Sequence, residues 1–142
     1  MEVAYDPGEL KVVAYKNGAQ IGEASVLTAG EPASLDLTPD RTEIKSDGMD
    51  LCYITISMVD ANGNICPLAM DMLEFTVDGA ARLMGVANGN QMGHDSFTDG
   101  SHPLFYGQAV AVLRSIPGKS GEATLSIRSE SGIEAETVIN FL

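Results

Sequence analysis

Basic residues are scarce in this sequence: 8 lysines and arginines stand against 20 aspartates and glutamates, for a formal net charge of −12. A protein that binds nucleic acid or an anionic membrane surface needs a positively charged face. Apolar runs are also short, and none approaches the roughly 20 residues of a membrane-spanning helix. The composition therefore excludes nucleic acids and membranes as partners and predicts an acidic surface exposed to water.

Tryptophan is absent, and there are only two cysteines. Cys52 and Cys66 flank Asn62-Gly63, and a two-residue hairpin turn there would place Cys66 opposite Val59 and Cys52 opposite Leu73. At about 3.3 Å per residue, that seven-residue offset is far beyond the reach of a disulfide. We therefore expect two free thiols, with Cys52 on the core face of its strand, and neither a metal site nor a cofactor.

Turn-forming residues are plentiful, since 15 glycines and 6 prolines separate strand-like segments at regular intervals. Apolar and polar residues alternate within these segments as in half-buried strands, and the helical period is missing nearly everywhere. The clearest case is 51–60, in which the even positions from Cys52 to Met58 are all apolar. From residue 31 onward we predict about seven or eight strands, the size of an immunoglobulin-like antiparallel β-sandwich. The antibody-type Cys…Trp…Cys core is missing, so the expected likeness to antibody domains is one of architecture only.

Short signals mark the turns between the predicted strands. Asn17-Gly18 marks the turn of the first hairpin. Asn62-Gly63 is typical of a type I′ hairpin turn, in which both central residues have positive φ angles. Further turns are predicted at Asp47-Gly48 and Ser131-Gly132. The predicted strand segments are the two arms of 9–30, followed by 31–40, a short strand within 42–48 that ends at the Asp47-Gly48 turn, 51–60, 72–79, 81–89, 104–115, 123–130 and 133–142. The segment 67–73 is expected to be a loop.

Residues 9–30 read as an almost self-contained β-hairpin, which is marginal in water by itself. We therefore divide the chain into 1–29, the terminal hairpin of a preceding Ig-like domain, and 30–142, an Ig-like β-sandwich domain. A start within a strand-like sequence, without signal-peptide features, fits an excised fragment. A hairpin separated from its sheet is expected to dock on its own domain, to form a homodimer with a second copy, or to be poorly ordered.

Carboxylates are abundant, but their placement argues against catalysis. A glycosidase-type pair needs two carboxyls about 5–10 Å apart in a cleft, with split pKa values. The segment 60–64 begins like a calcium loop, but Ile65 and Asp71 stand where that motif needs Gly and Glu. We therefore assign no catalytic, cofactor-binding or metal-binding residue. The aspartates in predicted turns, where the side chain bonds its own backbone, are Asp6, Asp40, Asp47, Asp60, Asp78 and Asp99.

The long irregular stretch 88–103 contains the one group of polar residues to which more than one role can be assigned. His94-Asp95 beside His102 could hold a metal or orient a nucleophile, but the spacing of the histidines matches no zinc pattern and no nucleophile motif is present. Long loops at the end of a sandwich also pack against neighbouring domains, or contact a saccharide or a partner. The candidate contact residues are Asn88, Asn90, His94, Asp95 and His102.

Two stretches resemble the C-terminal end of bacterial family 2 glycoside hydrolases of the β-galactosidase type. The opening Tyr5-x-Pro7-Gly8-x-Leu10 with Tyr15-x-Asn17-Gly18 is similar to the closing hairpin of the penultimate Ig-like domain. The segment GVANGNQMGHDSF, followed by FYGQAVAVLRS, resembles the loop and strand of the final domain. The resemblance implies a non-catalytic accessory domain of an enzyme that hydrolyses O-glycosidic bonds, with both catalytic glutamates on an absent upstream (β/α)8 barrel of typically about 250 residues.

The implied partners are the other domains of the parent glycosidase and a glycan substrate, and the implied location of the parent is periplasmic or secreted. Residues 30–50 and 59–64 also resemble Ig-like repeats of invasin and intimin type, which gives a rival function as a spacer domain in a surface adhesin. A third interpretation is a carbohydrate-binding module. Such modules stack sugars on exposed aromatic rings, and this sequence has 4 Tyr, 4 Phe and no Trp.

Overall fold

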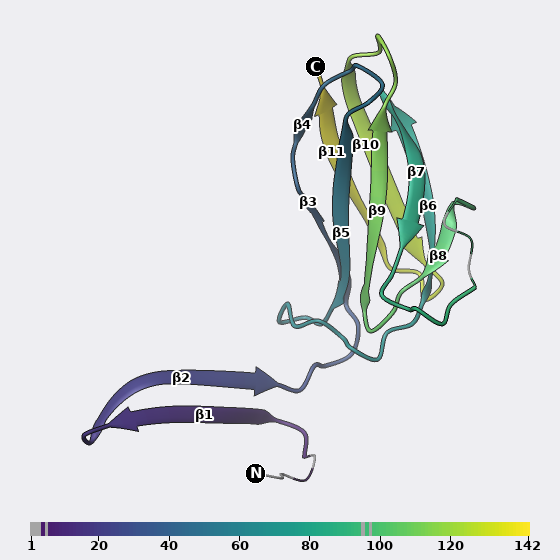
Figure 1. The fold of residues 1–142 in the computed structure, drawn as a ribbon. Coiled ribbons are helices and arrows are strands. Elements are labelled where there is room, and N and C mark those ends of the chain that lie inside the picture. The colour runs from purple at the N-terminus through teal and green to yellow at the C-terminus, as the bar shows by residue number, and fades with distance from the viewer. Residues whose placement is uncertain (1–3, 5, 95, 97) are drawn as a thin grey trace.

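A computed structural model describes residues 4, 6–94, 96 and 98–142 (Figure 1). It consists of a β-sandwich and a two-stranded ribbon that projects from one end of the sandwich. All regular elements in these described ranges are strands, which confirms the all-β prediction. The strands are β1 (Glu9–Lys16), β2 (Ala19–Leu27), β3 (Ser34–Pro39), β4 (Glu43–Ile44), β5 (Leu51–Val59), β6 (Met72–Gly79), β7 (Ala81–Ala87), β8 (Ser101–Pro103), β9 (Gln108–Ser115), β10 (Gly121–Ser129) and β11 (Glu134–Phe141).

A search of the described residues finds no helix with the length and apolar character required to cross a membrane.

Two sheets form the layers of the sandwich. One has four strands in the order β3-β5-β9-β7, and the other has five in the order β4-β11-β10-β6-β8. Neighbouring strands run antiparallel, apart from the short parallel pairing of β4 with β11. The chain passes from one sheet to the other between β5 and β6 and again between β6 and β7. This is the predicted immunoglobulin-like sandwich.

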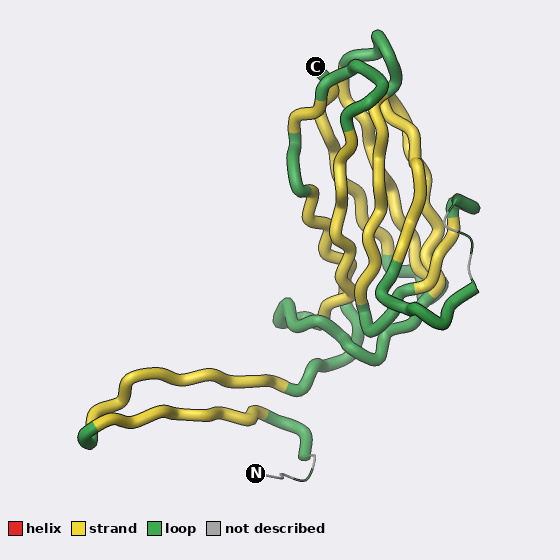
Figure 2. Tube along the Cα trace, in the orientation of Figure 1, coloured by secondary structure: helices red, strands yellow, loops and turns green. Residues whose placement is uncertain are grey.

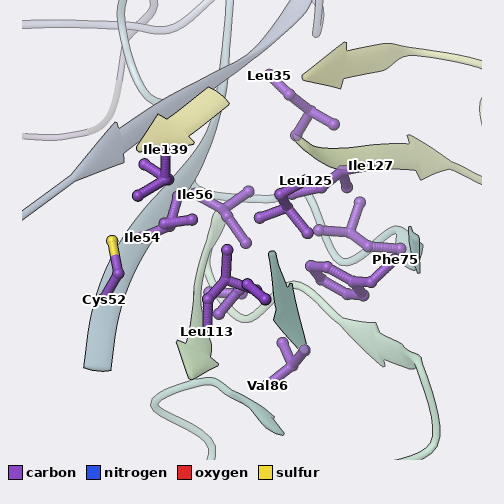
Figure 3. Packing of buried hydrophobic residues seen from close by; sticks show 14 of the residues in the cluster. Leu35, Cys52, Ile54, Ile56, Phe75, Val86, Leu113, Leu125, Ile127 and Ile139 are labelled. Atoms are coloured by element: carbon purple, nitrogen blue, oxygen red, sulfur yellow. The ribbon is translucent and has the colours of Figure 1, made fainter. Parts of the chain in front are cut away.

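The core lies between the two sheets and is built by alternation along each strand. On β5 the inward residues Cys52, Ile54 and Ile56 are fully buried, and from the facing sheet Leu125 and Ile139 are equally inaccessible. These side chains point toward one another in Figure 3. Each large aliphatic side chain removed from water contributes about 1.5–3 kcal/mol, so this layer holds the two sheets together.

The short strand and the turn predicted within 42–48 are present: the two residues of β4 pair with β11, and the Asp47 carboxylate accepts hydrogen bonds from two following amides, at 2.8 Å each, and turns the chain. The predicted strand over 104–115 is too long. The strand β9 begins at Gln108, because Tyr106 (φ 49°) and Gly107 (φ 77°) form a tight turn. A Cβ at residue 107 would lie 2.3 Å from a backbone oxygen, so this turn requires glycine.

The predicted hairpin turn is confirmed at Asn17-Gly18, whose φ angles of 51° and 78° are both positive. The type I′ turn predicted at Asn62-Gly63 is wrong. At the second site only Gly63 has a positive φ. A type I′ turn joins adjacent antiparallel strands, whereas β5 and β6 lie in different sheets, so this segment is a wider loop.

The cysteine positions follow from the same loop. Val59 bridges to Ile65, not to Cys66 as predicted, and Cys52 pairs with Leu113 in β9 instead of facing Leu73. Both thiols are nevertheless free and buried, and Cys52 lies on the core face as expected. Burial raises the pKa of the Cys52 thiol to about 11, so it is a neutral core group at physiological pH.

Truncation of one core side chain tests the sandwich. Leu125→Ala should lower the free energy of unfolding by about 2–5 kcal/mol, because the side chain is fully buried and leaves a cavity. Val138→Ala, on the solvent face of the neighbouring strand, should change it by less than about 0.5 kcal/mol. Urea denaturation measures both. Equal losses for the two variants would contradict the assignment of inner and outer faces.

Candidate functional site

The ribbon of β1 and β2 has one apolar face that lies in water. In its register Leu10 pairs with Val26, and Val12 lies on the same face; these three side chains are 52%, 69% and 58% exposed. The opposite face carries the ion pair of Lys11 with Glu23, at 3.0 Å. The described part of the chain supplies no third strand for the ribbon. An exposed apolar face on an open ribbon marks a contact with another folded unit.

Buried Asp60 connects the ribbon to the sandwich. One of its carboxylate oxygens accepts a hydrogen bond from the backbone N–H of Gly30, at 2.8 Å, in the segment that leads out of the ribbon. The other oxygen accepts from the amides of Asn62 and Asn64, at 2.9 Å each. The Gly30 amide, followed by these other donors, lowers the pKa of Asp60 from 3.8 to about 2. The carboxylate therefore joins the segment at Gly30 to the 60–64 loop.

A second apolar surface lies beside the base of the ribbon. The loop 65–71 exposes Ile65 (43%), Leu68 (87%) and Met70 (45%). The loop is held in place by Ala69, whose amide donates to the carbonyl of Cys66 at 3.1 Å. Figure 2 shows this loop region, in green, at the end of the sandwich from which the ribbon leaves.

An open groove of about 1180 Å³ lies between the ribbon base and this loop. Leu10, Val26 and Leu27 line one side, and Ile65 and Leu68 line the other. These apolar side chains are exposed to water, as at the contact between two domains, and the groove is also lined by carboxylates, among them Glu31 and Asp71. We call the ribbon's apolar face and this groove together the junction surface.

In the loop 88–103, two of the candidate residues serve the backbone. The Asn88 amide donates to the carbonyl of Pro103 at 2.8 Å and accepts from the N–H of Asn90 at 2.9 Å. The Asn90 side chain accepts from the N–H of Met92 at 3.0 Å. These bonds shape the loop, so the amides of Asn88 and Asn90 are occupied in local turns.

The two histidines are placed differently from each other. His102 is buried on β8, with Nδ1 3.2 Å from the carbonyl oxygen of Ser96. His94 is exposed at the outer part of the loop, near Met92, which is 85% exposed. The predicted candidate Asp95 lies outside the described residues. Of the described candidates, His94 is therefore the one whose side chain reaches the surface of the loop.

The carboxyls with perturbed pKa values are all held ionised. A hydrogen bond from Arg41 lowers the pKa of Asp50 to about 2, and the Met49 amide lowers that of Asp47. A glycosidase acid needs the opposite shift. Among the residues described, no cluster of three or more His, Cys, Asp or Glu side chains could hold a metal ion. Every carboxyl for which the described residues give a shifted pKa is thus shifted toward the ionised form.

The sandwich and its exposed ribbon define the class of protein: an all-β, immunoglobulin-like sandwich domain. Residues 35–138 match the model of the family described as glycoside hydrolase family 2 C-terminal domain 5. The chain belongs to this family.

Relatives are much longer proteins. The chain is 41% identical over 128 residues to the β-galactosidase BoGH2A of Bacteroides ovatus, covering 90% of this chain and 15% of that protein. A β-glucuronidase of Formosa agariphila is 36% identical over 90 residues, which is 61% of this chain and 9% of the relative. The crystal structure of a glycosyl hydrolase family 2 member from Bacteroides cellulosilyticus superposes with a TM-score of 0.94 at 35% identity, over 99% of this chain and 18% of that one. The chain thus spans less than a fifth of each.

The intimin likeness is confined to the fold. An intimin fragment superposes with a TM-score of 0.50 at 15% identity, over 77% of this chain and 33% of the fragment. A likeness at such low sequence identity supports a shared sandwich architecture and gives no evidence of a shared function.

Sequence reasoning missed the part that the 65–71 loop plays in the junction surface. The signal was present: Ile65, Pro67, Leu68 and Met70 place apolar residues in a predicted loop, where polar ones are usual. It also treated Asp60 as a local turn residue. Its bond to Gly30, thirty residues away, exists only in the folded chain.

Removing the Asp60 charge tests the connection. Because its pKa is lowered on folding, the carboxylate stabilises the fold above about pH 4, and this contribution is lost as the pH falls toward 2. Asp60→Asn should therefore have a lower urea midpoint than wild type at pH 6, and the gap should narrow on acidification. Asp36→Asn, at an exposed site on β3, is the control. A gap that stays constant with pH would exclude the charge as its cause.

Proposed function

We propose that this chain is a non-catalytic C-terminal accessory domain of a bacterial β-galactosidase-type glycoside hydrolase, whose bond-breaking residues lie in an upstream barrel. The observation that carries the proposal is the family match over residues 35–138. Its relatives include proteins named β-galactosidase and β-glucuronidase, of which the chain corresponds to a small part. The lowered carboxyl pKa values described above agree with a domain that does no acid–base chemistry.

We further propose that 1–29 is the closing hairpin of a preceding Ig-like domain and that 30–142 is the terminal domain. The apolar face at Leu10, Val12 and Val26 would then be the inner face of the preceding domain's sheet, covered by its second layer. The groove beside Leu68 would receive a loop of that domain. The Asp60–Gly30 hydrogen bond sets the direction in which the chain leaves the sandwich, and so positions the two domains.

The loop 88–103 is proposed to contact a neighbouring domain or the glycan at the edge of the active site. His94 is exposed, and the turns at Asn88 and Asn90 present it outward. In the absence of the preceding domain, the same apolar ribbon face could instead pair with a second copy. A spacer role in an adhesin is the alternative function, supported only by the fold.

The whole enzyme provides the first test. The protein encoded by the complete gene should hydrolyse an aryl β-galactoside or β-glucuronide, and this chain alone should release no aglycone. An enzyme truncated before Gly30 should have a lower Tm than the complete one, because the part of the preceding domain that packs against the 65–71 loop is then exposed to water. Turnover by the isolated chain, or tandem copies of this domain in place of a glycosidase barrel, would contradict the proposal.

A charge on the ribbon provides the second test. In the complete enzyme, Val12→Asp should reduce stability by more than about 2 kcal/mol, because it buries an unpaired charge between two sheet layers. Ser25→Asp, on the opposite face of the ribbon, is the matched control and should have little effect. In this chain alone both changes should be nearly neutral, because both positions are exposed. Thermal unfolding of the four proteins separates these outcomes. If Val12→Asp and Ser25→Asp destabilised the complete enzyme equally, the proposed division into two domains would be wrong.

A further inference from the structure

Three asparagines in this chain are followed directly by glycine: Asn17, Asn62 and Asn88. Asparagine is a chemically labile residue, and it is most labile before glycine, because glycine has no Cβ and its N–H can approach the preceding side chain freely. The reaction requires both the side chain and the following amide to be free to move. The structure places the three pairs in different surroundings and so distinguishes among them.

The first pair forms the turn at the free end of the ribbon, away from the sandwich (Figure 1). Asn17 and Gly18 are both exposed. In the described part of the chain, neither the Asn17 side chain nor the Gly18 N–H makes a hydrogen bond. The flanking strands β1 and β2 form a sheet of two strands, and all of their residues except Val13 are exposed. An isolated hairpin is marginal in water, so this turn can open at little cost in free energy.

The other two pairs are fixed by hydrogen bonds. The Gly63 N–H donates to the carbonyl oxygen of Asp60 at 3.1 Å. The Asp60 carboxylate, which is held ionised, accepts from the Asn62 N–H at 2.9 Å, and its negative charge opposes loss of a proton from the nearby Gly63 amide. The Asn88 side chain is half-buried, and its oxygen and nitrogen are both hydrogen-bonded within the loop 88–103. A reaction at either pair must first break these bonds.

We propose that Asn17 is a site of spontaneous deamidation, with water as the co-reactant. The Gly18 amide nitrogen, after losing its proton to hydroxide, attacks Cγ of Asn17. The N–Cγ bond forms, the Cγ–Nδ2 bond breaks, and Nδ2 takes a proton from water and leaves as ammonia. Water then opens the cyclic imide at one of its two carbonyl carbons. Attack at Cγ gives aspartate, and attack at the backbone carbonyl gives isoaspartate, whose main chain runs through Cβ and Cγ.

Both products change the ribbon. Each adds a negative charge to the turn. Isoaspartate also adds a methylene group to the backbone of a turn that has two residues between the paired Lys16 and Ala19. The turn fixes the register of a hairpin, so the longer backbone is expected to loosen the pairing of β1 with β2. The sandwich has its own core between two other sheets and should keep its stability.

Incubation of the folded chain at mildly alkaline pH, followed by peptide mapping with mass spectrometry, locates the reaction. The peptide with Asn17 should gain the mass difference between a hydroxyl and an amino group, and an isoaspartyl methyltransferase should methylate part of it. Reaction at Asn62 and Asn88 should be at least about fivefold slower, which is the factor that one broken hydrogen bond of ordinary strength supplies.

The unfolded chain is the matched control. In concentrated urea the three pairs lose their different surroundings, so they should react at similar rates. Asn17→Gln should remove most of the ammonia released by the folded chain, whereas Asn62→Gln should leave it nearly unchanged. In the aged chain, amide hydrogen exchange should be faster in β1 and β2, while the Tm of the sandwich stays the same. Asn17→Asp, which adds the charge without the extra methylene, separates the two effects.

Three results would overturn the proposal. The first is a folded chain in which Asn62 or Asn88 reacts as fast as Asn17. The second is a folded chain in which Asn17 stays intact under conditions where the unfolded chain reacts. The third is a preference for Asn17 that persists unchanged in urea, because the fold would then not be its cause.

Discussion

A β-sheet with one apolar face must cover that face with a second layer, and this constraint accounts for most of the molecule. In the sandwich it is met within the chain, where Ile54 and Ile56 of one sheet meet Leu125 and Ile139 of the other. In the ribbon it is not met, because Leu10 and Val26 lie in water. The chain therefore contains one sandwich with both of its layers and one ribbon whose apolar face lacks a second layer. The proposed role as a terminal domain that completes its neighbour follows from that imbalance.

Several acidic residues of the chain stabilise the fold by accepting hydrogen bonds, and they are not arranged for acid–base chemistry. Asp47 and Asp60 accept hydrogen bonds from backbone amides, and Asp50 pairs with Arg41. Each of these interactions favours the ionised form and lowers the pKa of the carboxyl. A glycosidase needs one carboxyl kept neutral by a dry environment, which is the opposite electrostatic arrangement. A family 2 domain with many acidic residues can thus be a scaffold, in which the carboxylates stabilise turns and keep the surface hydrated.

The surfaces of the domain divide into three kinds. The outer face of the five-stranded sheet is acidic and solvated, the junction surface is apolar and close to the ribbon, and the outer face of the four-stranded sheet combines Tyr53 with Arg82 and Arg114.

The sequence by itself determined the strands, the β-sandwich class, the inward residues of β5 and β10 and the hairpin at Asn17-Gly18, because alternation and turn preference are local properties of the chain. It also indicated the family through the order of its motifs. Only the tertiary structure decided that β5 and β6 lie in different sheets, which removed the expected turn at Asn62-Gly63 and the expected register of Cys66. The same holds for the parallel pairing of β4 with β11, the bond of Asp60 to Gly30, and the opposed Arg82 and Arg114. Each depends on a partner far away in sequence, and local patterns carry no information about which strand will lie alongside.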